Sequence, residues 1–269
     1  MPRTDARLYP ALLRHWRTRR GMSQLDLAVA ADVSSRHVSF LETARAKPSR
    51  EMVLRLGATL DVPLRDQNEM LRAAGFAAEF AEPSVDGELP ATITHAIDRM
   101  LALSEPFPLT VLDRAYNVLR TNVGAMRILG HFVASPAEMP ARMNAFHLLF
   151  DPRLCRPFIV EWDRIAHAMV ARLHREVLAR AGDSELTGLL HSLFEYPGVS
   201  ESWRQPDFST PSEPLATFRL KRGDLELSFL TTITGFSAPG NVTLEELRFE
   251  TYLPLDEPTE RACRRLAAG

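Results

Sequence analysis

The chain has 269 residues, of which 45% are hydrophobic and 25% charged, so it is long enough for two ordinary domains with packed cores. Charge is uneven: residues 1–75 carry 13 Lys and Arg against 8 Asp and Glu, and the remainder carries 19 against 26, which makes the amino-terminal part the candidate nucleic-acid-binding end. No apolar run approaches the roughly 20 residues that cross a bilayer, no signal-peptide core is present, and two distant cysteines exclude a disulfide framework, so we expect a cytoplasmic protein.

A stripe of apolar residues near the amino end predicts a first helix with a basic end at residues 17–20. The stripe consists of Leu8, Leu12, Leu13 and Trp16. Two further helices are predicted at residues 50–60, where Ser49 offers an N-cap, and at residues 64–73. Together with the two helices described next, they predict an all-α, five-helix domain.

Residues 23–42 have the spacing of a helix-turn-helix. Ser23 is a good N-cap for a short first helix, and Asp32 in the turn is one of the few non-glycine residues that tolerate a left-handed backbone. Ser34 offers a cap for the second helix. The positions expected to be buried are Leu25, Leu27, Ala28, Val33, Val38 and Leu41.

The second helix of this motif carries the face expected to read DNA. Arg bridges guanine O6 and N7, Ser reaches several base edges, and Phe packs on a thymine methyl, all in the major groove. The amino end of the first helix and the basic loop after the second helix are expected to meet phosphates. The candidate DNA-binding residues are Gln24, Ser34, Ser35, Arg36, Ser39, Phe40, Arg45 and Lys47. The alternative is a motif of the same geometry that serves only dimerisation or structure.

Residues 8–74 resemble the Xre, or lambda-repressor-like, family of five-helix DNA-binding domains. The resemblance is carried by Ser23-Gln24, Leu27-Ala28, Val33-Ser34, Val38-Ser39, Leu41-Glu42, Arg45, Pro48-Ser49, Leu54, Leu56 and Leu60. The chain departs from the family at Asp32 and Ala44, where that family commonly has glycine. Because alanine in a left-handed cap loses about 1 kcal/mol relative to glycine, we expect the end of the second helix to be built differently here.

An acidic stretch containing Pro and Gly at residues 77–90 predicts a linker between a domain at 1–76 and a second domain at 91–269. Apolar and β-branched alternation predicts strands in the second domain, and longer apolar periodicity predicts helices. The helices are expected at 92–104, 157–181 and 185–195, and the strands at 107–113, 116–120, 215–222, 225–236 and 244–253. This order is typical of a PAS-like fold, with an antiparallel five-stranded sheet and flanking helices, and the whole chain is classed as α+β.

Phrases in both domains resemble bacterial regulators of the MmyB-like group. They are Arg36–Thr43, Pro48–Leu56, Asp61–Arg65 and Leu71–Phe76 in the first domain, and Thr231–Phe236, Asn241–Arg248 and Pro254–Thr259 in the second. The resemblance implies an Xre-type domain joined to a PAS-like domain that holds a fatty-acid-like molecule. That ligand is implied by the family and not by the residues themselves.

Apolar side chains on the predicted strands and helices of the second domain are candidates for lining a ligand cavity. They are Phe107, Leu109, Val111, Met126, Leu129, Phe132, Phe146, Phe158, Trp162, Ile165, Met169, Leu227, Phe229 and Phe236. An ordinary packed core is the alternative role for each of them. Arg120, Arg142 or His147 offers a positive charge for a carboxylate head group at the mouth, with surface charge as the alternative.

Catalytic and metal-binding patterns are weak. His167 and His174 lie seven residues apart near Glu161 and Asp163, but without a metal-binding motif a charged solvent face explains them better. Cys155 near His147 lacks a third orienting group, so no catalytic residue, metal site or cofactor is predicted, apart from a bound fatty acid or similar apolar ligand.

We therefore expect a sequence-specific transcription regulator that binds an operator in double-stranded DNA as a homodimer and senses a hydrophobic, fatty-acid-like molecule. Two alternatives remain open at this point. One is a DNA-binding regulator whose second domain only dimerises or docks a partner protein, and the other is an enzyme fused to a DNA-binding domain.

Overall fold

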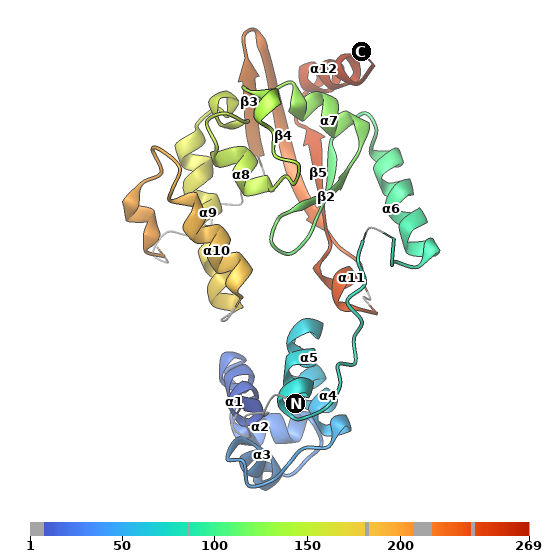
Figure 1. Ribbon diagram of the computed structural model, residues 1–269, viewed down its shortest axis with the longest axis vertical. Helices are drawn as coiled ribbons and strands as arrows, with labels where there is room; N and C mark the ends of the chain where they lie inside the picture. Colours follow the sequence, from blue (N-terminus) through green and yellow to red (C-terminus); the bar gives the residue numbers. More distant parts are fainter. Residues whose placement is uncertain (1–7, 86, 181–182, 207–216, 238–239, 269) are drawn as a thin grey trace. The chain divides into compact units, whose positions relative to one another are not determined.

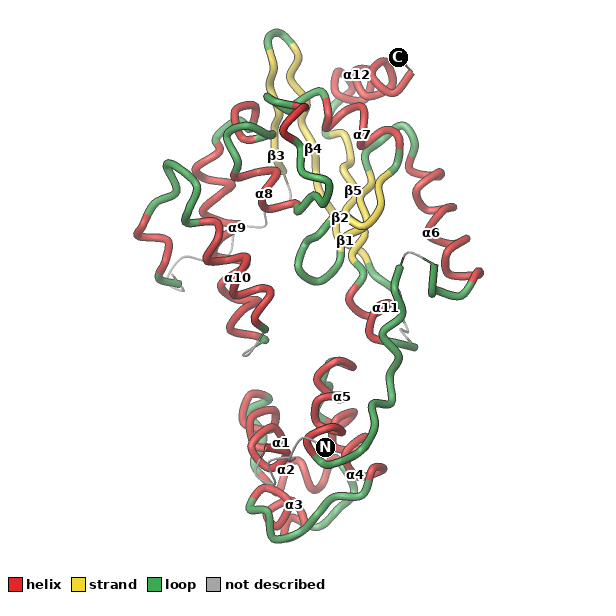
Figure 2. Tube along the Cα trace, in the orientation of Figure 1, coloured by secondary structure: helices red, strands yellow, loops and turns green. Residues whose placement is uncertain are grey.

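The computed structural model describes residues 8–85, 87–180, 183–206, 217–237 and 240–268, and the chain divides into two compact units (Figures 1 and 2). The first, here called the helical unit, consists of residues 1–84 and 236–245. The second, here called the sheet unit, consists of residues 85–235 and 246–269.

The helical unit contains the five predicted helices. They are α1 (Leu8–Arg19), α2 (Gln24–Ala30), α3 (Ser35–Glu42), α4 (Arg50–Thr59) and α5 (Leu64–Ala73). Their apolar faces meet in one core, in which Leu13, Leu27, Leu41 and Leu56 are completely buried. Burying a leucine side chain stabilises a fold by about 1.5–3 kcal/mol, so this core holds the helices together.

Two positions that were predicted to be buried are exposed. Leu8 is 48% exposed because it is the first residue of α1, and its neighbour Tyr9 occupies the core at 3%. Leu25 is 61% exposed, because residues two apart on a helix point about 200° away from each other and Leu27 faces the core.

Serine caps begin three of these helices, as predicted. The hydroxyl oxygens of Ser23, Ser34 and Ser49 each accept a hydrogen bond of 3.1 Å from the third backbone amide of α2, α3 and α4. Each cap satisfies an amide that the helix itself leaves unpaired, which stabilises the helix by about 1 kcal/mol. The helix boundaries predicted from these serines are therefore confirmed.

The end of α3 adopts the left-handed turn that glycine would favour, although the residue there is Ala44, with φ of 59°. The backbone amides of Arg45 and Ala46 both donate to the carbonyl of Phe40, at 2.8 and 3.2 Å. The expectation that alanine changes how this helix ends is therefore wrong. These two hydrogen bonds hold the usual geometry in spite of the steric cost of a Cβ atom.

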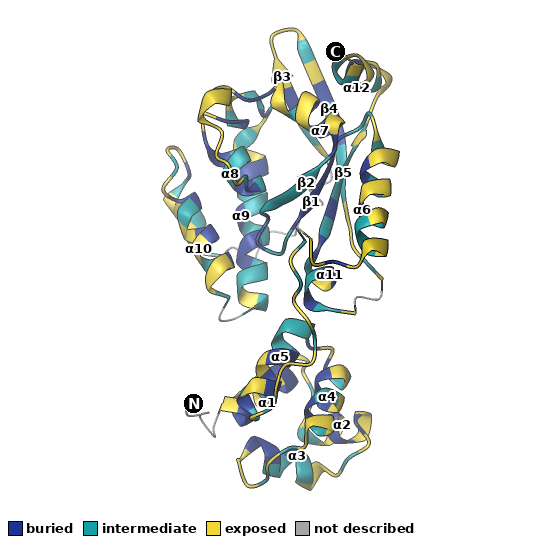
Figure 3. Ribbon diagram, turned by 45° about the vertical axis from the view of Figure 1, so that its right-hand side comes forward, coloured by how far each residue is buried: buried dark blue, intermediate teal, exposed yellow. Residues whose placement is uncertain are grey.

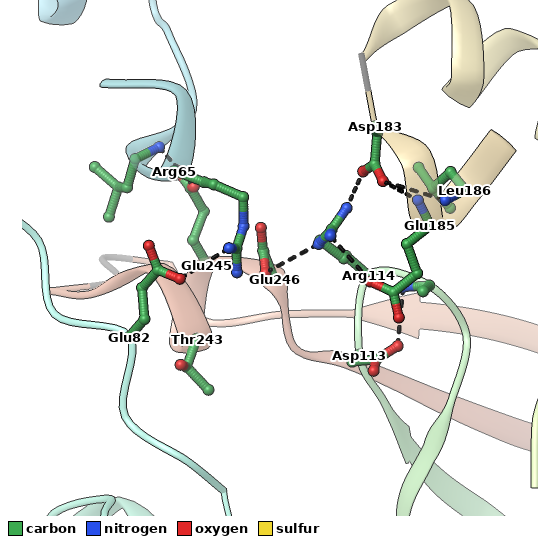
Figure 4. Close-up of polar contacts among 12 residues, drawn as sticks. Arg65, Glu82, Asp113, Arg114, Asp183, Glu185, Leu186, Thr243, Glu245 and Glu246 are labelled. Atoms are coloured by element: carbon green, nitrogen blue, oxygen red, sulfur yellow. Dashed lines mark hydrogen bonds and ion pairs between the residues drawn. The ribbon is translucent and has the colours of Figure 1, made fainter. Parts of the chain in front are cut away.

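Residues 236–245, here called the connector segment, belong to the helical unit although they lie far along the chain from α5. Within it begins α11 (Val242–Glu246). The Glu245 carboxylate accepts a hydrogen bond of 2.8 Å from the backbone amide of Leu64, at the amino end of α5 (Figure 4). The N-cap residue of that helix, Pro63, offers no side-chain acceptor, so Glu245 supplies the missing one from a distant part of the sequence.

The first half of the predicted linker also packs on the helical unit. The Asn68 amide oxygen of α5 accepts hydrogen bonds of 3.0 Å from the backbone amides of Glu79 and Phe80, and its nitrogen donates to the Phe80 carbonyl at 2.7 Å. The Val242 amide donates to the Ala81 carbonyl at 3.0 Å. Residues 79–81 are thus held between α5 and the connector segment.

The sheet unit is built on five antiparallel strands in the order β2-β1-β5-β4-β3, which is consistent with a PAS-like fold. The strands are β1 (Leu109–Leu112), β2 (Val118–Thr121), β3 (Thr217–Arg222), β4 (Leu225–Thr234) and β5 (Arg248–Pro254). The helices are α6 (Ala91–Ser104), α7 (Val123–Gly130), α8 (Ala145–Phe150), α9 (Trp162–Ala179), α10 (Ser184–Leu193) and α12 (Glu257–Ala268), with short 3-10 turns at Pro136–Glu138, Arg156–Phe158 and Glu201–Arg204.

Helices cover both sides of this sheet, and all four residues of β1 are buried (Figure 3). Both ribbon views place α8, α9 and α10 on one side, with α6 and α12 on the other. Arg114, in the turn after β1, contacts Asp183 at the start of α10 and lies 2.9 Å from Glu185 and 3.7 Å from Glu246 (Figure 4). These contacts connect the turn after β1 to the start of α10 and to the last residue of α11, just before β5.

The predicted secondary structure of this unit differs from the observed one in three respects. The strand predicted at 244–253 begins as α11, because the Asn241 side chain accepts from the Leu244 amide at 2.9 Å and caps a helical turn. The helix predicted at 157–181 begins only at Trp162, after a 3-10 turn. Helices α7, α8 and α12 were not predicted, and two of them are only six to eight residues long, too short for a clear apolar period.

Candidate functional site

The exposed side of α3 carries the residues that were predicted to read DNA. Ser34, Ser35 and Arg36 are exposed, and Ser39 and Phe40 are partly exposed. The Arg36 guanidinium lies 5.1 Å from the centre of the Phe40 ring, so the aromatic face holds the charged group at the surface. These five residues of α3 and its N-cap are here called the reading face.

A buried ion pair fixes α3 against α1. Arg17 donates to the two carboxylate oxygens of Glu42 at 2.6 and 3.0 Å, and the Gln24 side-chain amide donates to the same carboxylate at 2.8 Å. Burial alone would raise the pKa of Glu42, but the hydrogen bonds from Arg17 and Gln24 hold it below its ordinary value. Sequence reasoning placed Gln24 at a phosphate and Arg17 at a basic surface. In the structure both side chains contact Glu42 at the end of α3 and so help to position this helix, and the phosphate contact of Gln24 stays a prediction.

Two basic side chains follow the reading face in the loop after α3. Arg45 and Lys47 are exposed, and neither has an ion-pair partner in the part of the chain that the structure describes. The left-handed turn at Ala44 sets the direction in which this loop leaves the helix. Exposed side-chain cations in such a loop can neutralise phosphate groups of DNA.

The sheet unit contains a cavity of about 140 Å³ between the sheet and helices α7, α8 and α9. Engineered cavities of about 150 Å³ bind benzene, so this space holds a group of about six carbon atoms. Its lining consists of Thr110, Leu112, Tyr116, Val118, Leu129, Ala145, Leu148, Leu149, Cys155, Ile165, Met169, Arg172, Thr217, Phe218, Leu220, Thr231, Glu250 and Tyr252.

Only part of the predicted lining borders this cavity. Leu129, Ile165 and Met169 do so, from α7 and α9. Met126 is 58% exposed, and Phe236 belongs to the helical unit. The remaining predicted residues pack in the cores around the cavity or on the other side of the sheet, and they are Phe107, Leu109, Val111, Phe132, Phe146, Phe158, Trp162, Leu227 and Phe229.

The choice of strand face explains much of this difference. All four residues of β1 are buried because helices cover both sides of the sheet, so hydrophobicity does not indicate which side faces the cavity. The cavity side carries Thr110 and Leu112, whereas Leu109 and Val111 point to the opposite side. The predicted lining contains only apolar residues, whereas several polar strand residues border the cavity.

The polar side of the cavity comes mainly from the sheet and α9. Glu250 and Tyr252 of β5 both border it, and the Tyr252 hydroxyl donates to the Glu250 carboxylate at 2.9 Å. Burial raises the pKa of Glu250, and the nearby hydroxyl and arginines oppose this only in part. A titratable group in a largely apolar cavity was not found from the sequence. Its signal is an acidic residue in the middle of the strand pattern of β5.

Other residues considered from the sequence have structural roles. Arg120 contacts Asp98, and His147 lies 2.9 Å from the Tyr196 hydroxyl, and neither they nor Arg142 border the cavity. Burial raises the pKa of Cys155 to about 12, so its thiol is a poor nucleophile. Among the described residues no three His, Cys, Asp or Glu side chains gather to hold a metal ion. In the same part of the chain, no helix is long and apolar enough to span a bilayer.

Comparison with protein families matches both units. Residues 11–70 match a helix-turn-helix domain, and residues 93–266 match the MmyB-like transcription regulator ligand binding domain. A helix-turn-helix unit joined to a ligand-binding domain defines a DNA-binding transcription regulator. The chain belongs to the MmyB-like transcription regulators.

Comparison with individual proteins adds little. No curated protein matches the chain. A solved structure described as an RNA-binding Light-Oxygen-Voltage receptor aligns with 96% of this chain at 14% identity and a TM-score of 0.27, and this chain spans 62% of the length of that one. A similarity this low carries no argument about fold or function.

Proposed function

We propose that this regulator binds an operator as a homodimer through the reading face of α3, and that a hydrophobic, fatty-acid-like molecule in the cavity of the sheet unit changes this binding. The proposal includes no enzymatic step. One observation carries it: the strands β4 and β5 both contribute residues to the cavity, and the segment that joins them in sequence is part of the helical unit.

The connector segment offers a route for coupling along the chain. Thr231 of β4 and Glu250 of β5 border the cavity, and the connector segment lies between these two strands in sequence. Glu245, five residues before Glu250, accepts the hydrogen bond from the amino end of α5. A ligand that favours one position of β4 and β5 over another therefore has a covalent path to the DNA-binding unit. Coupling requires that the ligand bind one arrangement better than the other.

We assign direct base contacts to the reading face and phosphate contacts to the loop after it. Ser35, Arg36, Ser39 and Phe40 would enter the major groove, with Ser34 at its edge. Arg45 and Lys47 would meet phosphates. In a homodimer the two reading faces would contact half-sites about 34–36 Å apart, or one helical turn of DNA.

The test begins with the ligand. Native protein is purified, its intact mass is measured under non-denaturing conditions, and any small molecule released by denaturation is identified by mass spectrometry. We expect an apolar or fatty-acid-like molecule in stoichiometric amount, and its removal and return should shift affinity for an operator selected from random DNA. A ligand-free protein whose operator affinity no apolar molecule changes would contradict sensing and favour a unit that only dimerises or docks a partner protein.

The DNA part of the proposal is tested separately by the salt dependence of binding. Lys47→Ala should weaken binding to operator and random DNA alike and reduce the slope of log K against log salt by about 1, because one phosphate contact is lost. Lys221→Ala, which removes a lysine from the β3–β4 hairpin, is the matched control. An unchanged salt slope in Lys47→Ala would remove Lys47 from the phosphate contacts.

A further inference from the structure

The polar residues of the cavity form a defined cluster. Thr110 on β1 and Glu250 on β5 are direct partners in the strand register, and Tyr252 lies two residues further on the same face. The Thr110 hydroxyl is buried and lies near that of Tyr252, but it forms no well-oriented hydrogen bond within the described part of the chain. A buried polar atom without a good partner is destabilising, so this side of the cavity is suited to a polar ligand group.

Glu176 of α9 already has a full set of partners. Its carboxylate accepts from the Tyr116 hydroxyl at 2.5 Å, from Arg172 at 3.1 Å and from Arg248 at 2.9 Å. Burial disfavours its charged form, yet these groups together hold the pKa of Glu176 below its ordinary value. Glu176 is therefore ionised, and a single carboxylate is shared by two guanidinium groups.

Glu250 has no such support. Its hydrogen bond comes from the uncharged Tyr252 hydroxyl, and Arg172 and Arg248 act on it only through their charge. The net effect of burial is to raise the pKa of Glu250, which favours its neutral form. With Glu250 neutral, the two arginines and the ionised Glu176 leave one uncompensated positive charge beside the cavity.

We propose, building on the ligand-sensing function above, that Glu250 and Arg172 recognise the acidic head group of the ligand inside the cavity. The ligand carboxylate takes the place of the missing negative charge near Arg172, which borders the cavity, and accepts a hydrogen bond from neutral Glu250. When Glu250 is ionised in the empty protein, binding takes up one proton from solvent, and this proton stays on Glu250. The ligand tail occupies the apolar side formed by α7, α8 and α9.

The groups around Glu250 determine how binding depends on pH. The charged groups acting on it are Arg172 of α9 and Arg248 of β5, which both also donate to Glu176, and the neutral titratable groups nearby are Tyr116, Cys155 and Tyr252. The three neutral groups have raised pKa values, so they do not titrate near neutral pH. Affinity for an anion should therefore fall as pH rises through the pKa of Glu250, approaching tenfold for each pH unit above it.

Three probes of equal chain length separate the possibilities: hexanoate, 1-hexanol and hexylammonium. Each places about six carbon atoms in the cavity and differs only in its head group. Binding to the full-length native protein is followed by ligand-observed NMR titration between pH 5.5 and 8.5. We expect hexanoate to bind about tenfold more tightly than 1-hexanol at the acid end of this range and to lose that advantage as pH rises.

Two variants identify the residues responsible. Glu250→Gln keeps a hydrogen-bond donor without a titratable proton, so it should bind hexanoate with little dependence on pH. Arg172→Gln should lower affinity for hexanoate about tenfold and leave 1-hexanol nearly unchanged. Unchanged binding of 1-hexanol shows that the cavity of either variant is intact. Glu226→Gln, which makes the same substitution in the β3–β4 hairpin, should behave as native protein.

The outcomes separate this inference from the proposed function. Equal binding of hexanoate and 1-hexanol to native protein would overturn the inference and leave ligand sensing in place. Preference for hexylammonium, lost in Glu250→Gln, would also overturn it, because Glu250 would then act as an ionised partner. Failure of all three probes to bind native protein would overturn the inference together with the assignment of this cavity as the sensing site.

Discussion

Glu42 of the helical unit and Glu250 of the sheet unit are both carboxyl groups inside their units, but their surroundings are opposite. Glu42 accepts hydrogen bonds from Arg17 and Gln24, and this lowers its pKa. Glu250 has one uncharged donor, and burial raises its pKa. Glu42 therefore contributes stability that is present above its unfolded pKa and lost as pH falls, whereas the contribution of Glu250 is present at acid pH and lost as pH rises.

The two units therefore differ in where their candidate functional residues lie. The helical unit satisfies its buried Glu42 carboxylate with Arg17 and Gln24, and its candidate DNA-binding residues lie on the surface, at α3 and in the loop after it. The sheet unit keeps an incompletely satisfied polar group inside, beside a cavity. A satisfied interior group makes an element rigid, whereas an unsatisfied group that borders a cavity marks a place where a ligand can supply the missing partner.

The largest expected effect comes from breaking the Glu42 cluster. Arg17→Met leaves the Glu42 carboxylate buried without its main partner, which should destabilise the helical unit by about 3–5 kcal/mol. Urea denaturation of the full chain, followed by circular dichroism, measures the change. Arg55→Met, which removes the exposed i,i+4 pair with Glu51, should change stability by less than about 0.5 kcal/mol and serves as the control.

The reading face provides the second test, because a surface function should be separable from stability. Arg36→Ala should weaken binding to the preferred operator by about 1–3 kcal/mol, lower the preference for operator over random DNA, and leave the urea midpoint unchanged. Fluorescence anisotropy with both DNAs measures this. Normal operator affinity in the variant would show that α3 reads DNA through other side chains.

The left-handed residue at the end of α3 gives the third test. Ala44→Gly removes the Cβ from a backbone with φ of 59°, so it should stabilise the helical unit by about 1 kcal/mol. Operator affinity should stay within twofold, since the position of the following loop is kept. A loss of stability would mean that the turn in solution differs from the one described.

The smallest effect is expected at Glu250 and depends on pH. Because its pKa is raised in the folded protein, replacing it by Gln should stabilise the sheet unit at pH 8 and have almost no effect near pH 4. A gain of about 1 kcal/mol corresponds to roughly 2–4 °C in melting temperature for a domain of this size. Calorimetry at several pH values follows it, and an equal shift at every pH would contradict the comparison with Glu42.

The sequence predicts local features of the helical unit well because short-range chemistry determines them. Ser23, Ser34 and Ser49 cap the helices as expected, since a cap depends on only a few neighbouring residues. The partnership of Arg17 with Glu42 was not predicted, because it joins residues that are 25 positions apart. The sequence shows that the two residues carry opposite charges, but it does not show that the fold brings them into contact.

The strands of the sheet unit and their antiparallel sheet were predicted, but the spatial order of the strands and the lining of the cavity were not. All five strands were predicted. The residue pattern of β1 did not show which face of the strand borders the cavity, because both faces are buried. The connector segment was read as loop and strand, since nothing in its composition indicates that it belongs to the other unit. Its hydrogen bond from Leu64 to Glu245 spans 181 positions.

The connector segment has a consequence for exchanging domains between regulators of this kind. A fusion cut after residue 84 would look clean in the sequence, yet it would take away Glu245 and with it the acceptor at the amino end of α5. The DNA-binding unit therefore includes a segment from a distant part of the sequence and is not encoded by residues 1–84 alone. A working chimaera would have to carry residues 236–245 from the same parent as α5, inserted between strands that come from the other.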